Sequence, residues 1–143
     1  MSIEIEGLKD VLDRFEKITN PEGIEQALGQ ACALVERSAK QKAPKDNGEL
    51  RRSISSKVEG LQGIVFTPLE YAPYVEYGTG LFAEEAGRAD VPWHYQDDEG
   101  NWHSTSGQKP QPFMRPALDE NRTQIQQILK GGITKKWLIM TLY

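Results

Sequence analysis

The feature that most restricts the fold is one long stripe of helical periodicity, which begins at Pro21 and ends before Ala43-Pro44. Asn20 is a favourable capping residue, Pro21 suits the first helical position, and Glu22 places an acid in the first turn. Apolar and small side chains recur three and four positions apart along the stripe, at Ile24, Ala27, Leu28, Ala31, Leu34, Val35 and Ser38. The pattern predicts an amphipathic helix over residues 21–42, whose small side chains allow close packing on a sheet or another helix.

Shorter patterns on both sides of this helix predict further helices and strands. Residues 2–6 alternate isoleucine with polar residues, which is typical of a half-buried strand, and residues 8–18 have helical spacing. Apolar residues at even spacing within residues 50–58 predict a strand with one polar face. Residues 64–66 predict its antiparallel partner, which ends before Pro68.

A last amphipathic helix is predicted to begin near Pro116 and to end at Gly131-Gly132, because glycine commonly terminates helices. We therefore expect an α+β fold, with N-terminal helices and a C-terminal helix packed on a small, mostly antiparallel β-sheet. One domain is expected over residues 1–130, which is an ordinary length for a single domain. Residues 131–143 form an apolar tail that includes Trp137 and Leu138. The tail is predicted to add a strand to its own sheet or to a partner, with disorder as the remaining alternative.

Residues 81–109 have little periodicity and are predicted to form a long protruding hairpin loop with an acidic tip at Asp97, Asp98 and Glu99. Two registers are open. A four-residue loop pairs Tyr95 with Trp102, and also His94 with His103. A three-residue loop pairs Tyr95 with His103 instead.

Residues 69–80 hold three tyrosines and predict a short helical turn or an irregular segment. Tyr74 and Tyr77 are amphipathic side chains that can fill a core and also offer hydroxyls to a subunit boundary. We list them as candidate interface residues.

Charge is distributed unevenly along the chain, although its formal net charge is only −4. Residues 35–57 carry a net charge of +4, whereas residues 84–99 carry −5. One interpretation is two solvated faces. The other is a pair of complementary patches that meet between copies, with Arg51 and Arg52 of one copy opposite the acidic tip of another.

The residues that carry most enzyme chemistry are few. The lone Cys32 excludes an intrachain disulfide and a multi-cysteine zinc site, and it is expected to fill the core. His94, His103 and an acidic neighbour are a weak candidate for a divalent metal site. No nucleophile elbow or phosphate-binding glycine loop is present, so we expect no enzyme activity, catalytic residue, resident metal or cofactor.

Two further interpretations concern partners and location. The basic segment 37–57 is a candidate nucleic-acid-binding surface, although no aromatic residues interleave with its cations. The apolar run at residues 137–143 is far shorter than the roughly 20 residues that a membrane helix needs. We expect neither a membrane span nor a signal peptide, and a protein made in a cytosol.

Three blocks occur in a characteristic order. They are residues 43–54, with Ala43-Pro44 and Gly48-Glu49-Leu50-Arg51-Arg52-Ser53-Ile54; residues 71–80, Tyr-Ala-Pro-Tyr-Val-Glu-Tyr-Gly-Thr-Gly; and residues 107–118, Gly-Gln-Lys-Pro-Gln-Pro-Phe-Met-Arg-Pro-Ala-Leu. Together they resemble the tail-component (neck, or tail-completion) family of tailed bacteriophages, typified by gene product ten of phage HK-ninety-seven. The resemblance extends over about residues 1–130.

This resemblance implies a structural protein of a phage or prophage, located in the virion at the head–tail junction after assembly in the host cytoplasm. It implies tail completion or head–tail joining, a homo-oligomeric ring that is most commonly a hexamer, and contacts with other neck and tail proteins. Phage DNA would pass through the lumen of such a ring without specific binding. The family brings no catalytic residues to carry over.

Overall fold

The computed structural model describes residues 1–5, 21–46, 48–84 and 90–140, and it divides into two compact units. The sheet unit combines residues 2–68 with residues 113–143, and the hairpin unit holds Met1 and residues 69–112. Helices accompany two small antiparallel sheets, so the predicted α+β class is confirmed. The helix predicted over residues 8–18 lies outside the described residues.

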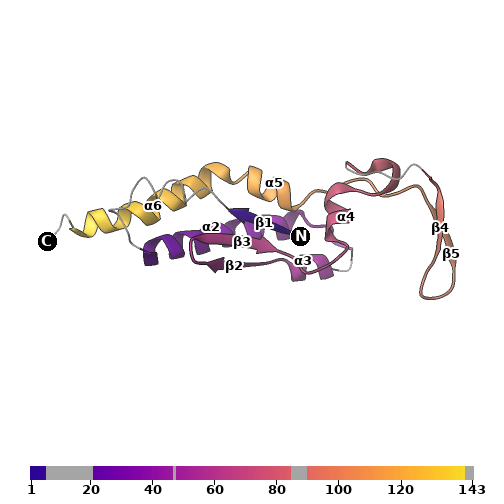
Figure 1. Cartoon of the computed structure of the whole chain (residues 1–143), viewed down its shortest axis with the longest axis horizontal. Helices are drawn as coiled ribbons and strands as arrows, with labels where there is room; N and C mark the ends of the chain where they lie inside the picture. Colours follow the sequence, from indigo (N-terminus) through magenta and orange to yellow (C-terminus); the bar gives the residue numbers. More distant parts are fainter. Residues whose placement is uncertain (6–20, 47, 85–89, 141–143) are drawn as a thin grey trace. The chain divides into compact units, whose positions relative to one another are not determined.

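The sheet unit is built on three strands in the order β1-β3-β2 (Figure 1). Strands β1 (Ser2–Ile5) and β2 (Ser55–Glu59) both pair antiparallel with the central β3 (Gln62–Phe66). The predicted N-terminal strand and the predicted hairpin are therefore confirmed. The turn between β2 and β3 uses only Gly60 and Leu61.

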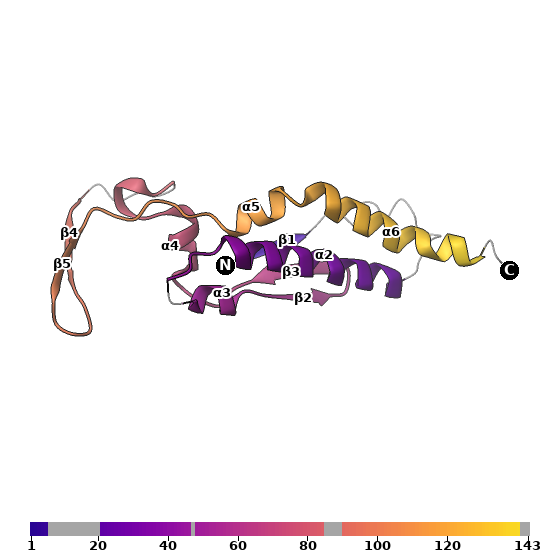
Figure 2. The ribbon, with the colours of Figure 1, turned by 180° about the vertical axis from the view of Figure 1, so that it is seen from behind.

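Helix α2 (Pro21–Lys42) covers one face of this sheet, as Figure 2 shows, and confirms the predicted long helix. The small residues of its stripe permit a close approach. A Cβ atom on Gly63 of β3 would lie only 2.4 Å from the sulfur of Cys32. Cys32 is buried, and burial, followed by the nearby charge of Glu36, raises the pKa of its thiol. The predicted role of Cys32 as a core residue is confirmed.

Residues 49–53 correct the strand predicted over residues 50–58, because they form a short helix, α3 (Glu49–Ser53). Leu50 and Ile54 are both buried, and a spacing of four fits a helical turn as well as a strand. The Arg52 amide donates to the Gly48 carbonyl at 3.1 Å, which closes the turn. The Ser53 hydroxyl donates to the Leu50 carbonyl at 2.7 Å. The polar residues at this point therefore satisfy a helical backbone, and β2 begins only at Ser55.

The C-terminal helical segment is divided into α5 (Met114–Asp119) and α6 (Arg122–Met140). The break falls at Glu120-Asn121, where the Asn121 side-chain amide donates to the Ala117 carbonyl at 2.7 Å. The predicted helix is thus confirmed over most of its length, with a start two residues before Pro116. Its predicted end is wrong, because α6 continues through Gly131-Gly132.

Gly132 is used for packing rather than for helix termination. A Cβ atom at this position would lie 2.4 Å from the Cβ of Ala27 and 2.7 Å from the carbonyl oxygen of Gly23. Helices α2 and α6 therefore cross with their backbones almost in contact. Residues 133–140 are helical, so the strand predicted for the tail is also wrong.

The hairpin unit begins with α4 (Ala72–Tyr77) and a 3-10 turn, η1 (Gly80–Phe82). These elements confirm the short helical turn predicted over residues 69–80. Strands β4 (Trp93–Gln96) and β5 (Trp102–Thr105) follow as a two-stranded antiparallel sheet.

Candidate functional site

The acidic tip joins β4 to β5 in the three-residue register. Tyr95 lies opposite His103, with ring centroids 5.2 Å apart and nearly parallel planes. The pairings expected for a four-residue loop, Tyr95 with Trp102 and His94 with His103, are therefore wrong. Gly100 has a φ of +88°, and a glycine in this region is what a three-residue hairpin loop requires.

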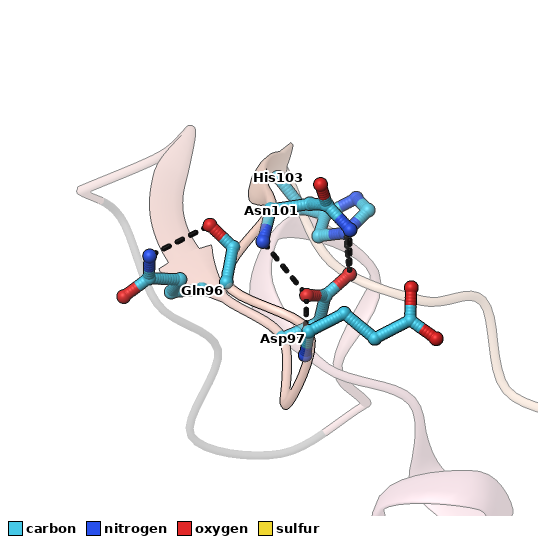
Figure 3. A network of polar contacts seen from close by, with 6 residues as sticks. Gln96, Asp97, Asn101 and His103 are labelled. Carbon is cyan, nitrogen blue, oxygen red and sulfur yellow. Dashed lines mark hydrogen bonds and ion pairs between the residues drawn. The ribbon is translucent and has the colours of Figure 1, made fainter.

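Asp97 holds this turn together, as Figure 3 shows. One of its carboxylate oxygens accepts the backbone amides of Glu99 and Asn101 at 3.0 and 2.8 Å. The other oxygen lies 2.7 Å from Nε2 of His103 and 3.2 Å from the Asn101 side-chain amide. The His103 contact, followed by the amide hydrogen bonds, lowers the pKa of Asp97 below its ordinary value.

The three acidic residues of the tip therefore differ in role. The Asp97 carboxylate is committed to the turn, whereas Asp98 and Glu99 are exposed. Asp97 belongs to the candidate interface only as the residue that positions the other two. His94 lies opposite Ser104, away from the Asp97–His103 pair. Within the described residues, no group of three histidine, cysteine or acidic side chains could hold a metal ion.

The base of the hairpin is fastened by contact between two distant glycine-containing segments. The Thr79 amide donates to the Gln108 carbonyl at 2.9 Å, and the Leu81 amide donates to the Ser106 carbonyl at 3.0 Å. A Cβ atom on Gly80 would lie 2.3 Å from the Ser106 carbonyl oxygen, so only glycine fits. Gly78 and Gly80 have positive φ values of +77° and +61°, which glycine adopts without strain.

Several aromatic side chains of this unit are exposed. Tyr74 is 60% exposed and Trp102 is 72% exposed, whereas Tyr77 is half-buried. A two-stranded hairpin is marginally stable by itself in water, and large exposed aromatic side chains are typical of contact surfaces. Tyr74 and Trp102 are thus better placed than Tyr77 to contact another protein.

The two arginines of the basic segment lie on α3 and not on the polar face of a strand. Arg51 is half-buried, and its Nη2 atom donates to the Ala43 carbonyl at 3.4 Å. Its Nε atom is buried without a hydrogen-bond partner among the described residues. Arg52 is exposed. Because neighbouring helical positions differ by about 100° around the axis, Arg51 and Arg52 point in different directions.

Arg51 lines an open groove of about 360 Å³ between α2 and α3. The groove is lined by Ala33, Glu36, Arg37, Lys40, Gln41 and Arg51. Glu36 accepts from Lys40 at 2.5 Å and from the Ser56 hydroxyl at 2.5 Å. Burial raises the pKa of Glu36, but the hydrogen bonds from Lys40 and Ser56 outweigh it, so that its pKa lies below the ordinary value.

Arg37 and Lys40 were not predicted as site residues. A signal was available, because Arg37, Lys40 and Gln41 lie three and four positions apart and so share one face of α2. The groove itself depends on α3 being helical, which the sequence analysis did not predict.

Trp137 and Leu138, the remaining candidate residues, are part of helix α6. Their part in an interface stays a prediction. No helix in the described part of the chain is long and apolar enough to cross a membrane.

Comparison with protein families gives one match. Residues 6–78, slightly more than half of the chain, match the family model described as "Bacteriophage HK97-gp10, putative tail-component". The matched segment includes the first block of the resemblance and most of the second, and it ends before the third, at residues 107–118. The chain matches no curated protein and no solved structure significantly.

Proposed function

The chain belongs to the HK97-gp10 family of bacteriophage tail components, and from this premise we propose that it is a ring-forming subunit of the head–tail junction, where it acts in tail completion and head–tail joining. The observation that carries the proposal is the family match, which includes the Gly48–Ile54 block and α4. A tail component is part of the virion and contacts other tail proteins.

The surface chemistry supports a ring. A closed ring needs heterologous interfaces, in which one patch of a subunit meets a different patch of its neighbour. The chain carries two such patches, the exposed acids Asp98 and Glu99 on the hairpin and the cation-lined groove beside α3. We propose a hexamer assembled in the host cytoplasm, with phage DNA passing through its lumen without specific binding.

Nucleic-acid binding by residues 37–57 is less well supported, because three of the seven lysine and arginine side chains in this segment form local ion pairs. Lys40 pairs with Glu36, and Lys42 pairs with Glu120 at 2.6 Å. Lys57 pairs with Glu59 at 2.5 Å. These pairs remove much of the positive charge that would meet a phosphate backbone.

Deletion of the gene from the phage or prophage that carries it tests the function. We expect DNA-filled heads and separate tails in electron micrographs of the lysate, and restoration of joined particles by the intact gene in trans. Normal, infectious particles from the deletion would overturn the proposal. Rings in micrographs of the purified chain would support the proposed oligomer independently.

A further inference from the structure

The groove between α2 and α3 has the chemistry of an acceptor for carboxylates. Arg37, Lys40 and Arg51 line it against a single acid, Glu36, so that its net charge is +2. Glu36 is already engaged by Lys40 and Ser56. Arg37 is exposed and makes no ion pair within the described part of the chain. Its charge is therefore available to a partner.

Arg51 adds a second observation. Within the described residues, its guanidinium makes one long hydrogen bond, to the Ala43 carbonyl, and its Nε atom has no acceptor. A buried donor without an acceptor costs free energy, and a small movement of the guanidinium toward a carboxylate would give it two. A carboxylate that enters the groove would therefore improve the hydrogen bonding of the Arg51 guanidinium.

The hairpin has the complementary chemistry. From Asp90 to Gln108 the chain contains four acidic residues and no lysine or arginine. Asp98 and Glu99 project from a turn that Asp97 holds in one conformation. The exposed Trp102 is the first residue of β5, shortly after this turn. The acidic tip is complementary in charge to the groove, and the exposed tryptophan beside it offers a large apolar surface for contact.

We propose that the hairpin tip of one copy docks in the α2–α3 groove of a second copy, with Asp98 and Glu99 facing Arg37 and Arg51. This inference rests on the proposed ring and names the surfaces that join its subunits. The interface is heterologous, because the hairpin and the groove are different surfaces of the same chain. Arg52 does not line the groove and takes no part in it.

Cross-linking between two variants that each carry one added cysteine tests the docking. Full-length Asp98→Cys is mixed with full-length Arg37→Cys under mild oxidation, and disulfide-linked heterodimer is measured by mass spectrometry. The native Cys32 does not interfere, because it is buried and its thiol pKa is raised. The matched control replaces Arg37→Cys by Glu25→Cys, a change at another exposed position of α2.

We expect heterodimer between the positions 98 and 37 to form at least about tenfold faster than between 98 and 25, and the difference to shrink at high salt, because ions screen exposed charges. Equal rates for the two pairs would overturn the inference. Rings in electron micrographs together with equal rates would leave the proposed function standing and remove only the docking. If cross-linking is rapid and specific but deletion of the gene leaves phage particles normal, the docking would stand and the proposed function would be removed.

Charge exchange gives a second, independent test by sedimentation of the full chain. Asp98→Lys and Arg37→Glu, introduced separately, should each weaken self-association by about tenfold, since like charges then meet across the interface. The chain that carries both changes should regain most of the lost association. Failure of the double variant to recover, with both single variants folded by circular dichroism, would overturn the inference.

Discussion

Gly107 lies directly against the carbonyl of Thr79, so closely that a Cβ atom on Gly107 would be 2.1 Å from that oxygen. Its φ of +117° is a conformation that other residues rarely adopt. The contact joins the second and third sequence blocks of the resemblance, although the family match ends at residue 78. The hairpin is thereby fastened to the segment that follows α4.

Substitution Gly107→Ala should disrupt the base of the hairpin. Both the steric contact and the positive φ oppose a side chain, and we expect a cost of at least about 2 kcal/mol. Faster amide exchange in residues 72–84 and 102–112, measured by mass spectrometry, would report it. Gly100→Ala is the matched control, because it shares the positive φ, at +88°, but its Cβ would approach no atom closer than 3.6 Å. Equal effects of the two substitutions would contradict the steric explanation.

The adjacent glycines of α6 make a matched pair for the helix crossing. Gly132→Ala should destabilise the sheet unit by about 1–3 kcal/mol, because the new methyl group would collide with Ala27 and the backbone of Gly23. Gly131→Ala meets no atom within 4 Å and should stabilise the helix by up to about 1 kcal/mol. Urea denaturation of the full chain measures both. The same sign for the two substitutions would show that α6 does not cross α2 at Gly132.

Asp97 should control the shape of the acidic tip. Asp97→Ala removes the acceptor of two backbone amides and the partner of His103, so the Tyr95–His103 ring contact should be lost from nuclear Overhauser spectra. Asp97→Asn keeps one oxygen for the backbone amides and should retain the turn in part. A persistent ring contact in Asp97→Ala would mean that strand pairing alone fixes the hairpin.

Much of the fold follows from local patterns. The errors in the predicted elements share one cause, a local pattern that fits two different structures. The helix at residues 21–42 and the hairpin at residues 55–66 have strong periodicity and clear end signals, so they were predictable. Spacing of four at Leu50 and Ile54 fits either element, and only the hydrogen bonds of Gly48 and Ser53 decide for a helix. The glycines of α6 have a similar ambiguity, because glycine ends helices and also permits close helix crossings.

The candidate site was predictable only in its charges. The sequence showed a basic and an acidic segment, but it did not show that Asp97 is used by its own turn or that Arg51 and Arg52 diverge on a helix. Arg37 and Lys40 join the groove because α3 packs beside α2, a tertiary relationship that no local pattern contains. The charge pattern therefore indicated the kind of surface, whereas the lining of the groove is known only from the structure.

Glu36 should make the stability of the sheet unit depend on acid pH. The carboxylate links α2 to β2 through Ser56, and its pKa in the folded chain is lower than the ordinary 4.5. A depressed folded-state pKa means that the unfolded chain takes up the proton first as pH falls. The contribution of Glu36 is therefore complete above about pH 4.5 and is lost as the pH decreases through its folded-state pKa.

Glu36→Gln tests this contribution, because glutamine keeps the shape and one acceptor oxygen but cannot ionise. At pH 7 we expect the variant to lose about 1 kcal/mol of unfolding free energy, the low end for hydrogen bonds to a charged group, since Glu36 and Lys40 are partly exposed. The two chains should converge as the pH falls below 4.5 and through the lowered folded-state pKa of Glu36. Urea denaturation of both chains between pH 3 and pH 7 measures the difference, and Glu25→Gln, an exposed position on the same helix, is the control. A difference that stays constant across this range would show that the charge of Glu36 does not stabilise the contact between α2 and β2.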